Sequence, residues 1–435
     1  MAHLPRLAVT RTAKLATLPL GYAGRTALGL GKRAFGRPAE LIAAEVQART
    51  AEQIFTVLGE LKGGAMKLGQ LLSVLESALP PAIVEPYRAA LTRLQDSAPA
   101  MPSATVHRVL AQDFGDGWRE HFAAFDDTPA ASASIGQVHR AVWADGRPVA
   151  VKVQYPGAAR ALRTDLRQVG RVAKLFGVLL PGLDVKAFVQ ELQERVEEEL
   201  DYGLEAEAWH AFAEAYEGDP DFAIPPVVAA SEHVIVTEWL DGVPLSRVIA
   251  EGTQEERDRA ALHLVRFSFS APTRCGLLHG DPHPGNFKIT QDGRLGVLDF
   301  GAVKRLPGGH PAAIGPLLRH GAAGDIEGVA EVFRREGVIR EGVEVDLAAL
   351  ASFVGPYAEP IAVPEFAFTR DWMRERGLYM FSDGSSIFRM LNVPPDYVVS
   401  FRVLTAGYGI LSQLAAKAPF RAEAERWIPG FADQD

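Results

Sequence analysis

The stretch from His279 to Gly301, HGDPHPGNFKITQDGRLGVLDFG, constrains the chain most, because it crowds two aspartates and an asparagine among turn-forming residues. Prolines and a glycine follow Asp281 and restrict the backbone, so we expect its carboxylate to be held in place. Asn286 comes five residues later, and Asp299 follows the hydrophobic run LGVL, which predicts a short strand. Carboxylate and amide oxygens from neighbouring turns can clamp Mg²⁺. The alternatives at this point are a metal–nucleotide site and a pair of solvated loops.

Size and composition limit the classes of protein to consider. A chain of 435 residues is too long for one ordinary core, so two or three structural units are expected. A net charge of −9 argues against nucleic-acid binding, which needs clustered cations. The only cysteine, Cys275, excludes an intramolecular disulfide and any cysteine-based metal centre, and it fits a reducing, cytoplasmic compartment.

The two ends of the chain raise the question of a membrane. Residues 1–37 form a basic arm without Asp or Glu, which suits an anionic surface and would make the protein peripheral on the inner face of the membrane. A loosely docked arm explains the same composition slightly better. The apolar stretch 398–420 contains Arg402 and Lys417, so it predicts a buried amphipathic helix instead of a membrane span.

The remaining chain divides into three further regions. Residues 38–118 show apolar positions at alternating steps of four and three, which predicts a helical extension. In 119–241, QVHRAVW and PVAVKVQ are joined by Asp145-Gly146, a strong hairpin signal, and a long acidic helix is expected over 184–216. Residues 242–435 look largely helical, apart from the short β-type runs NFKIT and LGVLDFG. This α+β pattern, a small sheet with one helix followed by a large helical lobe, is the outline of a two-lobed protein kinase.

Lys152 in PVAVKVQ lies between valines that should face the core, so its amine needs partners such as phosphate oxygens and a carboxylate. A solvated lysine at a strand edge is the alternative for this pattern alone. Glu205 is the carboxylate that we expect nearby, and it should share a helix face with Asp201, four residues earlier. The motif gains weight only from such partners.

Two backbone segments complete a nucleotide site. The loop PAASASIGQ precedes the lysine strand, and its small side chains let backbone N–H groups approach phosphate closely. The residues expected to do so are Ala131, Ser132, Ala133, Ser134, Ile135 and Gly136. The strand in HVIVTEWLDG ends at Glu238, Trp239 and Leu240, where the two lobes would join and backbone groups would bond adenine.

With KLGQ at residues 67–70, SASIGQVHRA, ELDYGLEA, HGDPHPGNF and DFG, the chain resembles the UbiB/AarF family of atypical protein-kinase-like proteins. The resemblance implies that ATP and Mg²⁺, or Mn²⁺, are the cofactors. It implies that Lys152 pairs with Glu205, that Asp281 is the catalytic base, and that Asn286 and Asp299 bind the metal. It also implies a regulatory role over the active site for Lys67, Gln70, Glu199 and Asp201.

The expected function is an ATP-dependent atypical kinase or ATPase linked to isoprenoid lipid or quinone metabolism, with a lipid or quinone precursor as a further ligand. Protein phosphorylation is disfavoured because HGD lacks the arginine of H-R-D, and the segment GAVKRLPGGHP offers no Ser, Thr or Tyr. Two alternatives stay open. One is a small-molecule phosphotransferase of the aminoglycoside or choline kinase type, and the other is a catalytically silent nucleotide-binding scaffold.

Overall fold

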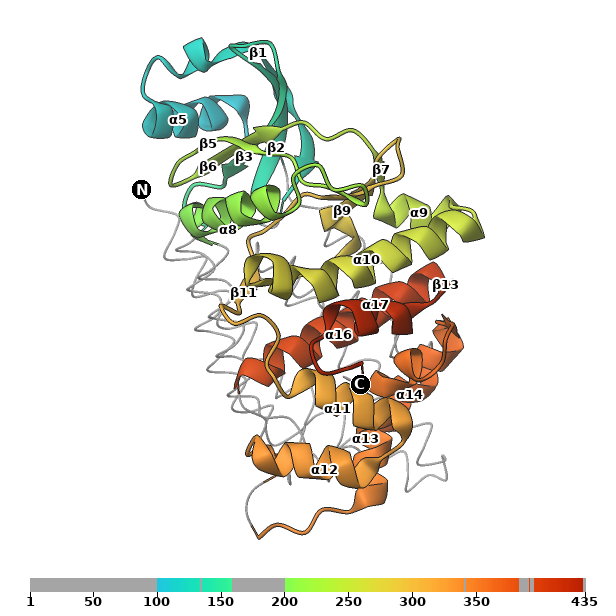
Figure 1. The fold of residues 1–435 in the computed structure, drawn as a ribbon. Coiled ribbons are helices and arrows are strands. Elements are labelled where there is room, and N and C mark those ends of the chain that lie inside the picture. Colours follow the sequence, from blue (N-terminus) through green and yellow to red (C-terminus); the bar gives the residue numbers. More distant parts are fainter. Residues whose placement is uncertain are drawn as a thin grey trace, which may run out of the picture.

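The computed structural model describes residues 100–133, 135–158, 200–339, 342–382, 391 and 395–432. The basic arm and the expectations for Lys67, Gln70, Ser134 and Glu199 lie outside these residues. The described chain forms a sheet-based lobe at one end and a helical lobe at the other (Figure 1). This arrangement confirms the expected two-lobed, kinase-like α+β fold.

The first lobe is built on a five-stranded antiparallel sheet in the order β1-β2-β3-β6-β5. Its strands are β1 (Phe122–Ser132), β2 (Gly136–Trp143), β3 (Pro148–Gln154), β5 (Val227–Ala230) and β6 (Val234–Glu238). The predicted hairpin joins β2 to β3, and Gly146 takes the positive φ of 91° that such a turn favours in glycine. Helix α5 (Ser103–Phe114) packs on one face of the sheet (Figure 1).

Strand β3 shows why the register of this sheet is fixed. Val149, Val151 and Val153 are fully buried in one core with α5, so the alternate residue Lys152 faces the opposite side of the sheet. Burying each valine contributes roughly 1.5–3 kcal/mol, and a slip by one residue would expose all three while burying the lysine.

Helix α8 (Tyr202–Ala215) follows, but the single acidic helix expected over 184–216 is wrong at one point. Asp201 is in an extended conformation and is the N-cap of α8, where its side chain accepts hydrogen bonds from the N–H groups of Gly203 and Leu204. The cap satisfies backbone donors that a continuous helix would use internally. The helix is therefore broken at Asp201.

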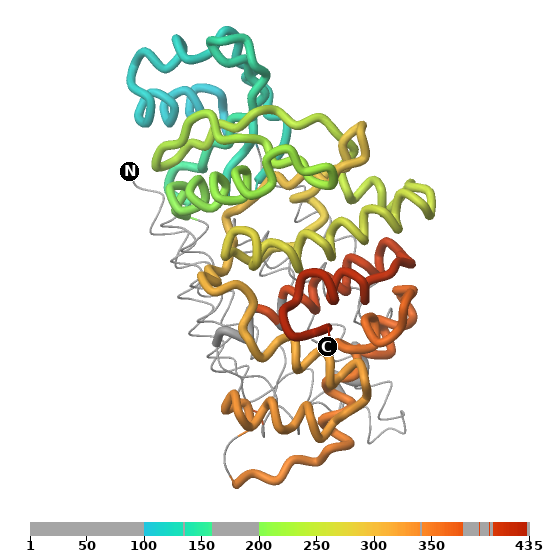
Figure 2. Tube along the Cα trace, in the orientation of Figure 1, coloured from blue at the N-terminus to red at the C-terminus, as the bar shows by residue number. Residues whose placement is uncertain are grey.

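The second lobe is largely helical around the long helix α10 (Gln254–Cys275) (Figure 2). A capping box between Thr253 and Glu256 starts this helix, and the left-handed Gly276 ends it. Among the described residues, the other helices of this lobe are α9 (Leu245–Glu251), α11 (Ile314–Ala323), α12 (Ile326–Arg335), α13 (Leu347–Ala362), α14 (Arg370–Ser382), α16 (Pro395–Leu414) and α17 (Phe420–Trp427).

Short strands connect the lobes and carry the loops of interest. A four-stranded sheet has the order β4-β10-β9-β7, and β8 pairs with β11. The strands are β4 (Phe222–Ala223), β7 (Val243–Pro244), β8 (Leu277–His279), β9 (Phe287–Ile289), β10 (Leu295–Val297) and β11 (Val303–Arg305). The runs NFKIT and LGVL were predicted as strands, whereas β7, β8 and β11 were not.

The apolar stretch near the C-terminus does form a helix. It is α16, which ends at Leu414, and β13 (Lys417–Ala418) then pairs with β12 (Phe366–Ala367). Ile410, Leu411 and Leu414 are buried in the core of the lobe. Within the described ranges, we find no helix with both the length and the apolar character needed to cross a membrane.

Candidate active site

The loop after β8 brings Asp281 and Asn286 together. The one-turn 3₁₀ helix η3 (Pro284–Asn286) folds the chain back, and the Asn286 amide nitrogen donates to the Asp281 carbonyl at 3.0 Å and to its carboxylate at 3.3 Å. His283 Nδ1 accepts from the N–H of Gly285 at 3.1 Å. These short-range bonds fix the positions of the carboxylate and the amide relative to each other.

Asp299 follows β10, and the chain around it is tied to the same loop. His279 Nε2 donates to the Asp299 carbonyl at 2.8 Å, and the N–H of Gly280 donates to the Ala302 carbonyl at 2.7 Å. The Asp299 carboxylate accepts from the N–H of Gly301 at 2.9 Å. Asp281 and Asp299 therefore belong to one hairpin-like unit that these hydrogen bonds hold together.

Lys152 reaches this unit from the sheet. Its Nζ lies 2.7 Å from Glu205 Oε1 and 3.2 Å from Asp299 Oδ2. The side chain of Glu205 is 1% exposed and that of Lys152 is 12% exposed. Burial alone would lower the pKa of Lys152, but the charges of Asp299 and Glu205 outweigh it and raise that pKa well above the ordinary 10.5. The ammonium group is therefore charged at any physiological pH.

Asp201 does not join this cluster in the expected way. It is exposed at the N-cap of α8, whereas Glu205 is buried in the first turn of the helix. The two carboxylates therefore do not share a helix face, because Asp201 precedes the helical backbone. A cap signal, an aspartate just before the first apolar turn, was available in the sequence.

The alanine-rich loop is shorter than expected. Ala131 and Ser132 are the last residues of β1, Gly136 is the first of β2, and the Ala133 N–H donates to the Gly136 carbonyl at 2.9 Å. A Cβ on Gly136 would lie 2.3 Å from the Val153 carbonyl oxygen, so only glycine fits this close approach of two strands. The described part of the loop is thus a tight turn above the lysine strand.

The connection between the lobes is also fixed. The Trp239 N–H donates to the Pro148 carbonyl at 2.9 Å, and Lys288 Nζ donates to the Leu240 carbonyl at 3.0 Å. The Trp239 ring also faces two cations, with Arg140 at 4.9 Å and Lys288 at 5.2 Å from its centroid. Lys288 lies in the predicted NFKIT strand, but no motif pointed to its contact with Leu240.

All these parts line one pocket of about 540 Å³ between the lobes. This volume lies in the usual range for small-molecule sites. The predicted residues in its wall are Ala131, Ser132, Ala133, Ile135, Lys152, Glu205, Glu238, Trp239, Leu240, Asp281, Asn286 and Asp299. Gly136 is not in the wall and acts through strand packing.

A metal ion would depend on the nucleotide for part of its coordination. Among the described residues, no three His, Cys, Asp or Glu side chains form a ready-made metal centre. Asn286 and Asp299 nevertheless present amide and carboxylate oxygens to the same pocket, which are the donors that Mg²⁺ takes together with phosphate oxygens and water. The residues present therefore fit a magnesium–nucleotide complex.

Comparison with known proteins agrees with this geometry. Residues 93–333 match the model of the ABC1 atypical kinase-like domain. The chain is 35% identical over 320 residues to the mitochondrial atypical kinase coq-8 of Caenorhabditis elegans, covering 70% of this chain and 41% of that protein. It is 34% identical over 279 residues to an uncharacterized Synechocystis protein, covering 60% of this chain and 67% of the relative.

A solved structure extends the similarity further. The Mycobacterium tuberculosis protein Rv3197, solved in complex with erythromycin, is 45% identical, with a TM-score of 0.69 over 91% of this chain and 100% of that one. The mitochondrial relatives are longer, and the chain spans 41–49% of the length of those from Caenorhabditis elegans, Danio rerio and Rattus norvegicus. The matched domain and these similarities show that the chain belongs to the ABC1 atypical kinase-like family, which includes the UbiB/AarF proteins.

Proposed function

We propose that the protein binds ATP with Mg²⁺ in the pocket between the lobes and hydrolyses it. The observation that carries this proposal is the position of Lys152, held 2.7 Å from Glu205 and 3.2 Å from Asp299 in the wall that also contains Asp281 and Asn286. A buried strand lysine that pairs with a helix glutamate and lies close to the aspartate of Asp-Phe-Gly is the arrangement that orients nucleotide phosphates in kinases.

Each residue has a distinct part in this proposal. Lys152 binds phosphate oxygens, and Glu205 holds the amine in place. Asn286 and Asp299 would hold Mg²⁺, which neutralises charge on the phosphate oxygens when it is bound. Asp281 orients the attacking water and accepts its proton, so it acts as the general base. Its carboxylate is held in position by the hydrogen bond from the Asn286 amide.

The segment after Asp299 supports hydrolysis over protein phosphorylation. Val303 pairs with His279, so the chain enters a strand only two residues after the DFG glycine, and α11 begins at Ile314. Protein kinases place a long activation loop here, which is phosphorylated and ordered by arginine pairs. The short β11 connection leaves no equivalent segment to form a docking platform for a protein substrate.

The second ligand is a separate proposal. The names of the mitochondrial relatives and the family resemblance support a lipid or quinone precursor as this ligand. In that case the protein would associate with an anionic membrane surface. The erythromycin complex of the Mycobacterium tuberculosis protein favours instead a bulky small molecule, which could be bound or phosphorylated. These candidates differ in where the γ-phosphate of ATP goes.

One experiment separates the candidates. Purified protein is incubated with γ-labelled ATP and Mg²⁺, alone or with anionic liposomes, a phenolic quinone precursor or erythromycin, and both free phosphate and labelled acceptor are measured. We expect phosphate release that lipid or phenol increases, without labelled acceptor, and at least about 10²-fold less release for Asp299→Asn. Labelled erythromycin would support the phosphotransferase alternative. Phosphate release equal in wild type and Asp299→Asn would contradict the proposed site.

A further inference from the structure

Helix α8, which carries Glu205, packs with the helical lobe. Its buried residues Ala208, Trp209 and Phe212, and its C-cap residue Tyr216, belong to the same hydrophobic core as α10 and Phe300. The core of the sheet lobe is formed with α5 instead and contains no residue of α8. The helix also contacts strands β5 and β6 of the sheet, and Tyr202 at its start forms a small separate cluster with Ile135 and Ile235.

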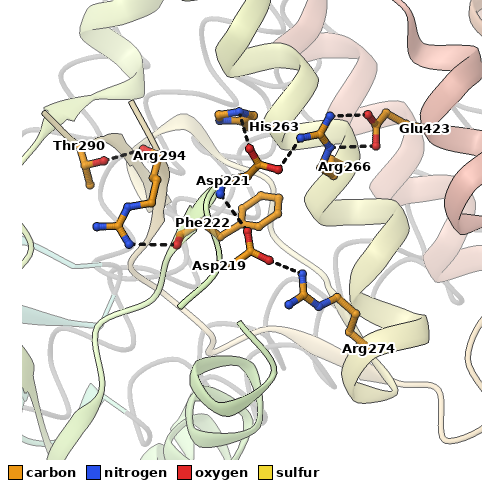
Figure 3. Close-up of polar contacts among 9 residues, drawn as sticks. All are labelled: Asp219, Asp221, Phe222, His263, Arg266, Arg274, Thr290, Arg294 and Glu423. Atoms are coloured by element: carbon orange, nitrogen blue, oxygen red, sulfur yellow. Dashed lines mark hydrogen bonds and ion pairs between the residues drawn. The ribbon is translucent and has the colours of Figure 1, made fainter. Parts of the chain in front are cut away.

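A first set of polar contacts ties the end of α8 to α10. Arg274 donates to the Asp219 carboxylate and to the Ala215 carbonyl, each at 2.6 Å, and its guanidinium lies 3.9 Å from the centroid of the Tyr216 ring. A hydrogen bond of 2.7 Å joins Tyr216 Oη to Ser270 Oγ. Figure 3 shows Arg274 on α10 reaching toward Asp219 in the segment that follows α8.

A second set continues along the same segment. Arg266 on α10 donates to the Asp221 carboxylate and to both oxygens of Glu423 on α17, at 3.0 and 2.6 Å (Figure 3). His263 Nε2 lies 3.6 Å from Asp221. The next residue, Phe222, begins β4 and pairs with β10 of the helical lobe. We call Arg266, Arg274, Asp219 and Asp221 the α8 clamp.

The clamp is stronger than an ordinary surface ion pair. Within the clamp, the side chain of Asp219 is 11% exposed and that of Asp221 is 29% exposed, and Glu423, which also binds Arg266, is 7% exposed. Water therefore competes poorly for Asp219 and Glu423 and more for Asp221. Arg266 holds Glu423 with two nitrogens, and charge-assisted bonds of this forked kind are about twice as strong as neutral ones. Toward the sheet lobe, Lys152 contacts Glu205 at 2.7 Å, and Gln154 donates to the Leu200 carbonyl just before α8 at 3.1 Å.

We propose that α8 is a fixed part of the helical lobe and that Arg274 and Arg266 are positioning residues for Glu205. This inference rests on the proposed function, because it assigns the clamp to the Lys152–Glu205 pair of the ATP site. Opening of the pocket then moves the sheet, with Lys152, across a stationary α8. The pair forms when the sheet closes, and it does not require α8 to swing.

Kinetics of a double-mutant cycle test the positioning role. We expect Arg274→Gln to lower kcat for ATP hydrolysis about tenfold and to change the KM for ATP less than about twofold, since it acts on the position of Glu205. In a Glu205→Gln background the same substitution should cause no further loss, because the residue through which it acts is already changed. An equal tenfold loss in both backgrounds would show a merely structural role and overturn the proposal.

Hydrogen exchange tests the same inference without any activity. In the wild-type full chain, the amides of α8 (Tyr202–Ala215) should exchange hydrogen with solvent at rates similar to those of α10. Arg274→Gln should increase the exchange rate in α8 by about tenfold without changing that in α5. Arg305→Gln is the matched control, since it breaks an exposed 3.1 Å pair with Glu207 on the same helix and should change neither rate.

Two results would separate failure of this inference from failure of the proposed function. Exchange of α8 together with the sheet strands and α5 would refute the fixed helix, whatever the protein hydrolyses. Exchange as expected in a protein that neither binds nor hydrolyses ATP would refute the catalytic site and the positioning role, and leave only the packing of α8. The milder variant Asp219→Asn keeps the measurement possible if Arg274→Gln does not fold.

Discussion

Replacing Lys152 with methionine removes the cation from the centre of the candidate site while preserving the length of the side chain. The ammonium group contacts Glu205 at 2.7 Å and Asp299 at 3.2 Å. Breaking a buried ion pair costs roughly 3–5 kcal/mol of stability. The side chain of Asp299 is 27% exposed, so water relieves part of the loss, and we expect a cost of about 3 kcal/mol at the lower end of that range.

This cost predicts two measurable effects. Domains of about 150–250 residues lose about 2–4 °C of melting temperature per kcal/mol, and larger ones lose less, so Lys152→Met should melt at most roughly 6–12 °C below the wild type. If the same 3 kcal/mol is lost from the transition state, ATP hydrolysis should fall about 10²-fold. Both are accessible by thermal denaturation and by phosphate release.

A double variant distinguishes the two effects. Lys152→Met combined with Glu205→Leu replaces the ion pair by apolar groups, which should restore most of the melting temperature but none of the ATP hydrolysis. Because the raised pKa of Lys152 keeps it charged, its stabilisation is complete below the ordinary value of 10.5 and is lost only as pH rises through the raised value. The melting difference should therefore be constant from about pH 6 to 10. A melting temperature of Lys152→Met equal to that of the wild type would refute the reasoning.

Two further predictions concern the loop and the pH dependence of stability. Gly136→Ala should weaken ATP binding at least about fivefold in calorimetry, because the added Cβ would lie 2.3 Å from the Val153 carbonyl oxygen and displace the turn; unchanged affinity would contradict this. Burial lowers the pKa of three histidines below the ordinary 6.5. They are His139, His263 and His310. The unfolded chain binds protons more readily, so the melting temperature should fall as pH drops from 6.5 toward the lowered values; a constant melting temperature from pH 7 to 5 would refute this.

The sequence predicted those parts of the site that have a local signature. Asp145-Gly146 fixed the expectation of a hairpin, and the alternation around Lys152 predicted which face of the sheet its amine would occupy. The contact of Lys152 with Asp299 spans 147 residues. It was not predicted, because the sequence and the family resemblance indicated only the pairing of Lys152 with Glu205 and a metal-binding role for Asp299. Local chemistry thus located the functional groups, and their mutual distances needed the fold.

What the sequence did not predict lies mostly in contacts without a motif. Arg274 and Asp219 are 55 residues apart. Each would be read as an ordinary surface charge, because nothing nearby marks either as buried. The break at Asp201 was missed for a different reason, since acidic and apolar residues continue with helical spacing through the cap. A cap changes the backbone of one residue without interrupting that spacing.

The packing of Phe300 helps to fix the position of the neighbouring Asp299. The ring is almost fully buried, and its centroid lies 4.6 Å from that of Phe212, 5.1 Å from Trp209 and 5.7 Å from His279. Turning Phe300 out of this core, as happens when a DFG segment inverts, would leave a cavity that costs at least ~3 kcal/mol. At that cost the inverted state is populated below about 1%. Because Phe212 and Trp209 belong to α8, the same core that holds Asp299 toward the pocket also holds Glu205. In the proposed function, the carboxylates of Asp299 and Glu205 would therefore move as one unit, and the sheet with Lys152 would be the part that responds to the nucleotide.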